Sequence, residues 1–136
     1  MTLEVRLSIQ DDAPYLLQWL NDPFILQWFP MDTEKEVEDC VRVWMSYAVK
    51  GGSLTAVQDN IPIGMATLYL QPYEKLKHQC LFAIVIDNQH RGKKVGTYLL
   101  TELINLAKQQ HHIEILHLEV YEGNPAIGLY QKLGFR

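Results

Sequence analysis

This chain has few cysteines and no long hydrophobic run. These two features argue against a disulfide-rich protein and against a membrane-spanning one. Its 136 residues include two cysteines, Cys40 and Cys80, each in an apolar pattern that favours buried free thiols in a reducing compartment over a disulfide framework. No run of about 18 apolar residues occurs, so we expect no transmembrane helix and no membrane partner. Glu4 and Arg6 lie in a strand-like N-terminal pattern, which is not that of a signal peptide. The expected location is the cytoplasm.

A broad excess of basic charge is also missing. Residues 1–50 hold nine acidic and four basic residues, a net charge of −5, whereas residues 51–136 hold seven acidic and eight basic ones, a net charge of +1. A nucleic-acid partner is not expected, because such proteins normally show a wider basic face. A local basic loop suits a small polyanion, and an acidic N-terminal half suits a cationic partner, although acids that only solvate helix faces explain the same imbalance. No spacing of histidines and cysteines is typical of a metal site.

The apolar pattern predicts one mixed α/β domain over residues 1–136. A hydrophobic content of 48% supports a single core, and no linker, repeat or low-complexity segment divides the chain. Apolar spacing predicts strands near 3–9, 54–58, 61–70, 80–86 and 115–121, and helices near 12–20, 34–50, 95–107 and 125–133. Asp11 or Asp12 is expected to cap the first helix, and Thr33 with Glu36 to form a capping box. We expect segment 24–30 to be irregular and Asp59-Asn60 to form a hairpin turn.

The most informative segment is 84–97, which reads as a strand, a basic loop and a helix start. Gly92 allows the backbone to approach a ligand, Gly96 permits tight helix entry, and the helix from Val95 supplies its dipole. Positive charge comes from Arg91, Lys93 and Lys94. A pyrophosphate needs these features, although a solvated turn with surface lysines would contain the same residues. The glycine spacing fits neither a Walker A loop nor a dinucleotide fingerprint.

A second informative segment, Glu119 to Phe135, follows about thirty residues later. The order and spacing of the two segments predict a function more specifically than either segment alone. Asn124-Pro125 predicts a helix start, and Gly134 a helix end. Together, segments 84–97 and 119–135 resemble the acetyl-CoA-binding core of the GNAT N-acetyltransferase superfamily. Residues 91–96 match the family's Arg/Gln-x-x-Gly-x-Gly/Ala loop with Lys94 in place of the first glycine, and residues 124–135 match its Asn-x-x-Ala-x-x-Leu-Tyr-x-x-x-Gly-Phe signature with one residue fewer before the alanine.

The resemblance implies a GNAT-like α/β (α+β) fold, with a mixed, mostly antiparallel central sheet flanked by helices. It also implies acetyl-CoA as cosubstrate. The backbone of Ile84, Val85 and Ile86 would pair with the pantetheine arm, and the amide of Ile86 would polarise the acetyl carbonyl. Asn124 would contact the cofactor or only cap its helix. The implied pyrophosphate cradle comprises Arg91, Gly92, Lys93, Lys94, Val95, Gly96 and Thr97.

Two residues are implied as catalytic. Tyr130 corresponds to the family's usual general acid, which protonates the departing CoA thiolate; a core tyrosine on an apolar helix stripe is the alternative. The Leu-Glu-Val at 118–120 resembles that of ribosomal-protein-alanine-type members, in which the glutamate acts as base through water, and the run 19–23 resembles the opening of those and of aminoglycoside-type members. Glu119 is therefore the first candidate base, with a solvated edge carboxylate as its alternative.

These features predict direct acetyl transfer from acetyl-CoA to a primary amine, a small molecule or a peptide, in a ternary complex without a metal. The alternative is a non-catalytic acyl-CoA-binding or regulatory domain, which two features favour. Lys94 replaces a motif glycine, and Arg136 ends the sequence where the family continues with two more strands. We therefore expect the C-terminal strands to be truncated and a sheet edge to be open, with exchange between chains of a homodimer as one way to cover it.

Overall fold

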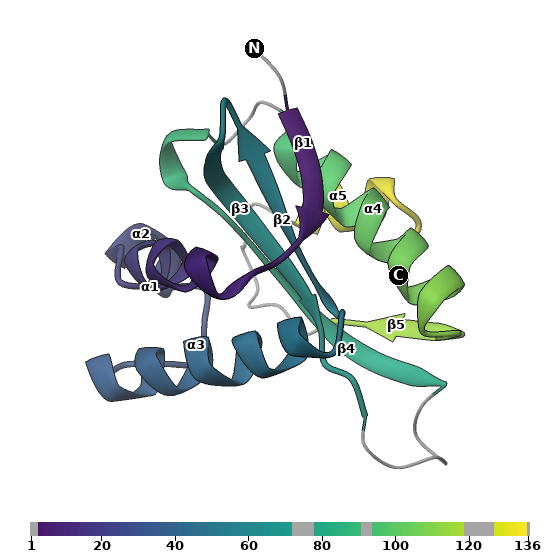
Figure 1. Ribbon diagram of the computed structural model, residues 1–136, viewed down its shortest axis with the longest axis horizontal. Coiled ribbons are helices and arrows are strands. Elements are labelled where there is room, and N and C mark those ends of the chain that lie inside the picture. The colour runs from purple at the N-terminus through teal and green to yellow at the C-terminus, as the bar shows by residue number, and fades with distance from the viewer. Residues whose placement is uncertain (1–2, 72–77, 91–93, 119–126, 136) are drawn as a thin grey trace.

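The computed structural model describes residues 3–71, 78–90, 94–118 and 127–135. A five-stranded sheet runs through the molecule in the order β1-β2-β3-β4-β5 (Figure 1). Its strands are β1 (Leu3–Leu7), β2 (Ser53–Gln58), β3 (Ile61–Leu68), β4 (Gln79–Ile86) and β5 (Ile115–His117). The first four are antiparallel neighbours, and β5 is parallel to β4. The predicted mixed, mostly antiparallel sheet is confirmed.

Helices cover both faces of this sheet (Figure 1). One face carries α1 (Ala13–Leu20), α2 (Pro23–Leu26) and α3 (Glu34–Val49), and the other carries α4 (Val95–Gln110) and α5 (Ile127–Lys132). Short 3-10 turns, η1 (Gln10–Asp12) and η3 (Asn88–His90), precede α1 and follow β4. The prediction that segment 24–30 is irregular is wrong at its start. Asp22 caps α2 by accepting the Phe24 amide at 2.9 Å, and Pro23 fits the first helical turn.

The strand β4 separates two hydrophobic cores because its side chains alternate between the faces. Phe82 and Ile84 pack with the α4 core, which includes the fully buried Leu99. Val85 packs on the other face with the core of α1 and α3, which includes Trp44. The nearly continuous apolar run at 80–86 therefore fits a strand buried on both sides, as predicted.

The turns follow local sequence chemistry. Asp59 and Asn60 both have positive φ, 51° and 68°, which is the geometry that a two-residue β2–β3 hairpin favours. Gly51, with φ of 75°, follows the end of α3. Thr33 and Glu36 form the predicted capping box, with the Glu36 amide donating to Thr33 Oγ1 at 3.1 Å and the Thr33 amide donating to Glu36 Oε1 at 3.0 Å.

Asp12 is the N-cap residue of α1, as predicted. Its carboxylate, however, makes no capping hydrogen bond to that helix. It instead accepts hydrogen bonds from both terminal nitrogens of Arg6 at 2.8 and 2.9 Å, from the Ile9 amide at 2.9 Å and from the Thr55 hydroxyl at 2.8 Å. Burial acts to raise the pKa of Asp12, but these hydrogen bonds outweigh it and hold the pKa below its usual value. The ion pair ties β1 to the start of α1, and the Thr55 hydrogen bond ties both to β2.

Cys40 and Cys80 are both free thiols, as predicted; Cys80 is buried and Cys40 half-buried. None of the described helices combines the length and apolar character needed to cross a membrane. On the outer side of β5, the described residues supply no further strand.

Candidate functional site

The part of β4 that follows its pairing with β5 is the first element of the candidate site. β4 has eight residues, but its pairing with β5 involves only Gln79, Cys80 and Leu81, with Leu81 opposite His117. On that side of Phe82–Ile86, the described part of the chain supplies no paired strand. We call the point after the Leu81–His117 pair the vertex.

Hydrogen bonds to β3 show which β4 groups face this open side. The Tyr69 amide donates to the Leu81 carbonyl at 2.8 Å, and the Asp87 amide donates to the Ile63 carbonyl at 2.8 Å. Backbone groups alternate along a strand, so the odd-numbered residues from 81 to 87 are directed at β3 and the even-numbered ones away from it. The N–H and C=O groups of Ile84 and Ile86 are therefore directed at the open side, whereas those of Val85 are directed at β3.

The second element is the N-terminus of α4, close in sequence to the end of β4. Lys94 is the N-cap residue and adopts a left-handed backbone with φ of 64° and ψ of 13°, which glycine adopts more readily. Its side chain is exposed and forms no cap hydrogen bond. The helix dipole and the Lys94 ammonium thus place positive potential at this end of α4.

The predicted cradle residues Val95, Gly96 and Thr97 belong to the first turn of α4, and the first two also have roles in packing. Val95 is buried in the α4 core, which leaves its backbone for any ligand. A Cβ atom on Gly96 would lie 3.2 Å from Leu129 Cδ2, so glycine here allows α5 to approach α4 closely. Thr97 is half-buried in the first turn of α4.

Tyr130, on α5, lies beside the vertex. Its ring meets the Phe82 ring edge-on, with centroids 6.0 Å apart, and the Phe135 ring at 6.1 Å. Phe82 is the first β4 residue after the pairing with β5 ends. Tyr130 is half-buried and packs against the α4 core, so it is part of the hydrophobic core and also adjacent to the vertex.

The remaining predicted site residues lie outside the described residues. They are Arg91, Gly92, Lys93, Glu119 and Asn124. Their predicted roles stay predictions. Within the described ranges, no three histidine, cysteine or acidic side chains gather where they could hold a metal ion.

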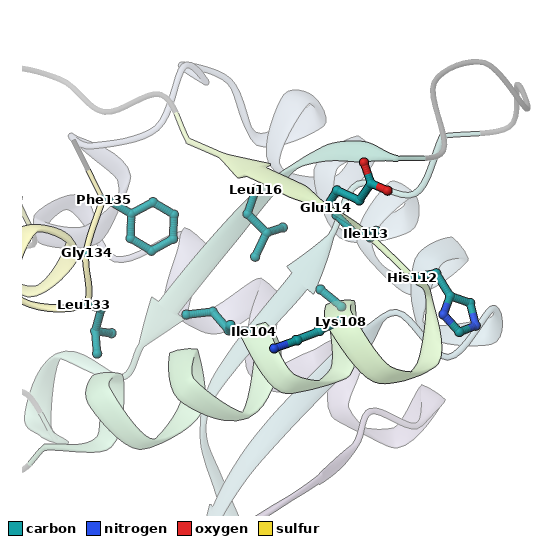
Figure 2. Close-up of a pocket in the computed structure, with 10 residues that line it drawn as sticks. Ile104, Lys108, His112, Ile113, Glu114, Leu116, Leu133, Gly134 and Phe135 are labelled. Atoms are coloured by element: carbon teal, nitrogen blue, oxygen red, sulfur yellow. The ribbon is translucent and has the colours of Figure 1, made fainter.

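A large cleft, of about 760 Å³, lies away from the start of α4 (Figure 2). Its apolar lining includes Ile104 on α4, Leu116 on β5 and Phe135 after α5, and the charged Lys108 and Glu114 also line it. Ile104 is nine positions from Val95, or about 14 Å along the helix axis at 1.5 Å per residue. The cleft therefore does not include residues 94–97, the described part of the predicted pyrophosphate loop.

Two features of the site were not predicted from the sequence. The position of Phe82 as the ring between the vertex and Tyr130 depends on where the pairing with β5 stops, and no local pattern encodes that point. Tyr69 lies at the same level of the sheet as the vertex, because it is opposite Leu81. An aromatic residue at the end of an apolar strand was its only sequence signal.

Comparison with known proteins gives a consistent result. The sequence model of the acetyltransferase (GNAT) family matches residues 13–135. The N-alpha-acetyltransferase of Sulfurisphaera tokodaii is 29% identical over 132 residues, which are 96% of this chain and 70% of that protein. The L-amino acid N-acetyltransferase AaaT of Escherichia coli is 29% identical over 83 residues, which are 60% of this chain and 51% of that protein. The chain thus matches only about half of one relative's length.

Solved structures show the same architecture. The ribosomal-protein-alanine N-acetyltransferase from Brucella melitensis has a TM-score of 0.83 and 25% identity, with 98% of this chain and 84% of that chain covered. The structure of yncA from Salmonella typhimurium, which contains its cofactor acetyl-CoA, has a TM-score of 0.84 over 100% of this chain and 80% of that one. At 18% identity, the second likeness shows the fold alone.

Proposed function

Because the match over residues 13–135 shows that this chain belongs to the acetyltransferase (GNAT) family, we propose that it is an acetyl-CoA-dependent N-acetyltransferase acting on a primary amine. The acetyl group passes directly from the thioester to the amine in a ternary complex. The observation that carries this proposal is the arrangement at the open edge of β4. Its three parts are the backbone groups of Ile84 and Ile86, which are directed away from β3, the positive end of α4, and the Tyr130 ring beside Phe82.

The cofactor is proposed to bind along this path. The open backbone groups of Ile84 and Ile86 offer strand-like hydrogen bonds to the amides of the pantetheine arm. The start of α4 with Lys94 offers the pyrophosphate an N-terminal dipole and a cation. A cofactor bound in this order would have its thioester near the vertex, beside Phe82 and Tyr130.

Acetyl transfer requires two proton movements. The amine nitrogen attacks the thioester carbon, so that a C–N bond forms and the C–S bond breaks. The amine loses a proton, for which Glu119 is the proposed base, and the departing thiolate gains one, for which Tyr130 is the proposed acid. The packing of Tyr130 against Phe82 supports this second role, because it fixes the ring beside the vertex.

The test is calorimetric titration with acetyl-CoA of the wild type, Lys94→Glu and Lys108→Glu. Both lysines are exposed and lie at opposite ends of α4, so the variants change the net charge equally. We expect the wild type to bind, Lys94→Glu to bind at least about tenfold more weakly, and Lys108→Glu to bind like the wild type. Release of the CoA thiol should then be followed with a panel of primary amines.

Each outcome decides a different part of the proposal. Absence of wild-type binding contradicts it entirely, and equal binding of both variants contradicts the location of the pyrophosphate. Tight binding with no turnover on any primary amine would favour the non-catalytic acyl-CoA-binding alternative.

A further inference from the structure

A second cavity, of about 360 Å³, lies on the opposite face of the sheet from Tyr130. Its apolar lining consists of Met31, Cys40, Val43, Trp44, Tyr47 and Tyr69, and we call it the α3 cavity. The Tyr47 and Tyr69 rings are stacked, with centroids 5.6 Å apart. Burial raises the pKa of Tyr69 to about 12, and it raises the pKa of Cys40 too, so both groups are neutral at pH 7.

The charge of the α3 cavity comes from the carboxylates of Glu36 and Asp39. The amides of Asp32 and Thr33 hold the pKa of Glu36 below its usual value, and Arg42 does the same for Asp39, so both are ionised. The hydrogen bonds to Glu36 all reach Oε1, which leaves Oε2 without a partner among the described residues. No described lysine or arginine lines the cavity, but Asp39 is ion-paired with Arg42 at 2.7 Å and with Lys35 at 3.7 Å. The carboxylate of Glu36 is therefore the one that carries negative charge not already paired with a cation among the described residues.

The register of the sheet places this cavity next to the vertex. The Tyr69 amide donates to the carbonyl of Leu81 at 2.8 Å, and Leu81 is the last β4 residue paired with β5, opposite His117. These three residues therefore lie at one level across neighbouring strands, which are about 4.8 Å apart. The α3 cavity, which Tyr69 lines, is therefore at the same level of the sheet as the vertex, on the face that carries α3.

We propose that the α3 cavity holds the amine acceptor, and that this acceptor is an apolar primary amine without a carboxylate. This inference rests on the acetyl transfer proposed above. The aromatic lining packs against the apolar body of the acceptor, and Glu36 attracts its ammonium form. The same carboxylate repels the carboxylate of a free amino acid. A free amine and a peptide N-terminus share the required chemistry, and the probes below separate them.

The first experiment compares binding of three probes by ¹⁵N–¹H spectra of the full chain, a measurement that does not depend on turnover. Phenylalaninamide imitates a peptide N-terminus, phenethylamine is a free amine, and phenylalanine differs from phenylalaninamide only in its carboxylate. We expect phenylalaninamide to shift the amides of Val43, Tyr47 and Tyr69 and to bind about tenfold more tightly than phenylalanine. Phenethylamine binding as tightly as phenylalaninamide would assign a free amine, and weaker binding a peptide N-terminus.

The second experiment fills the cavity with Val43→Trp and uses Val49→Trp as the matched control. Both valines are on α3 and exposed, at 50% and 77%, but only Val43 lines the cavity. We expect Val43→Trp to raise the Kd of phenylalaninamide about tenfold and to leave the Kd of acetyl-CoA unchanged, whereas Val49→Trp changes neither.

Three results would overturn the inference: no shift at the cavity amides, phenylalanine binding as tightly as phenylalaninamide, or equal effects of the two tryptophan variants. Failure of the proposed function is a separate result. It would appear as loss of acetyl-CoA binding or of turnover while the probes still bind the α3 cavity.

Discussion

Lys94 offers a test that separates backbone strain from charge at the proposed pyrophosphate site. Its φ of 64° is a conformation that costs an L-residue about 1–2 kcal/mol. Glycine removes this strain, but it destabilises the fold by about 0.4–1 kcal/mol because the unfolded chain gains conformational entropy. Lys94→Gly should therefore stabilise the fold by about 0.5–1 kcal/mol, or raise Tm by about 2–3 °C for a chain of this size. Lys94→Ala keeps the strain, so its stability should stay within about 0.5 kcal/mol of the wild type.

The two variants should behave alike toward acetyl-CoA. Each loses one exposed ammonium group, which is worth about 0.5–1 kcal/mol at a charged ligand, so each should raise Kd about two- to fivefold. His112→Gly is the matched control, because His112 also has positive φ, 53°, and lies beyond the far end of α4. It should stabilise the fold without changing Kd.

Thermal unfolding and calorimetric titration of the three variants give both quantities. The reasoning is refuted if Lys94→Gly lowers Tm, or if Lys94→Ala stabilises the fold as much as Lys94→Gly does. An unchanged Kd in both Lys94 variants would place the pyrophosphate away from this residue.

Three further predictions concern the sheet and α5. Asp12→Asn should destabilise the fold by about 2–4 kcal/mol at pH 7, since it leaves Arg6 without its buried partner. Because the pKa of Asp12 is depressed, the stability it confers is present above its ordinary value of about 3.9 and is lost as pH falls through the depressed value. The gap between the urea midpoints of wild type and variant should thus shrink toward pH 2.5, and a constant gap would contradict this cause. Gly64→Ala should cost about 1–3 kcal/mol in urea unfolding, because its Cβ would lie 3.1 Å from the backbone oxygen of Val85 and 2.7 Å from Ile86 Cδ1, so that the Ile86 side chain would have to shift. Gly128→Ala, with open space around its Cβ, should instead stabilise α5 by about 0.5–1 kcal/mol, and equal effects of the two alanines would contradict the packing argument. Tyr130→Phe should lower kcat about 10²–10⁴-fold in stopped-flow turnover with little change in acetyl-CoA affinity, and an unchanged kcat under chemistry-limited conditions would remove Tyr130 from catalysis.

Local chemistry explains why most elements were predictable. The capping box of Thr33 and Glu36 and the turn at Asp59-Asn60 depend on residues within a few positions of one another, so the sequence displays them directly. Segment 24–30 was predicted wrongly because the short helix α2 depends on one side-chain cap, Asp22, rather than on apolar periodicity. Asp12 was predicted correctly at the start of α1, but its carboxylate binds Arg6 and not the amides of that helix.

In the candidate site too, features within one short motif were predictable and features that depend on strand register were not. The sequence identified the basic loop and the tyrosine of α5 because each belongs to a contiguous motif. The directions of the Ile84 and Ile86 backbone groups could not be predicted, because they depend on the register with β3, in which Leu81 is opposite Tyr69. The α3 cavity was equally hidden, since its lining combines one face of a helix with a residue that follows a distant strand.

The sequence by itself determined the family, the order of the strands and of the helices other than α2, and the segments predicted to bind the cofactor. Periodicity, capping residues and glycine positions act over a few neighbouring residues, and a linear pattern records them. Only the tertiary structure decided where the pairing of β4 with β5 stops, that Tyr130 packs beside that point, and that Asp12 bonds Thr55, which is 43 positions away. Contacts of this kind depend on strand register and on the packing of whole elements, which no short stretch of sequence specifies.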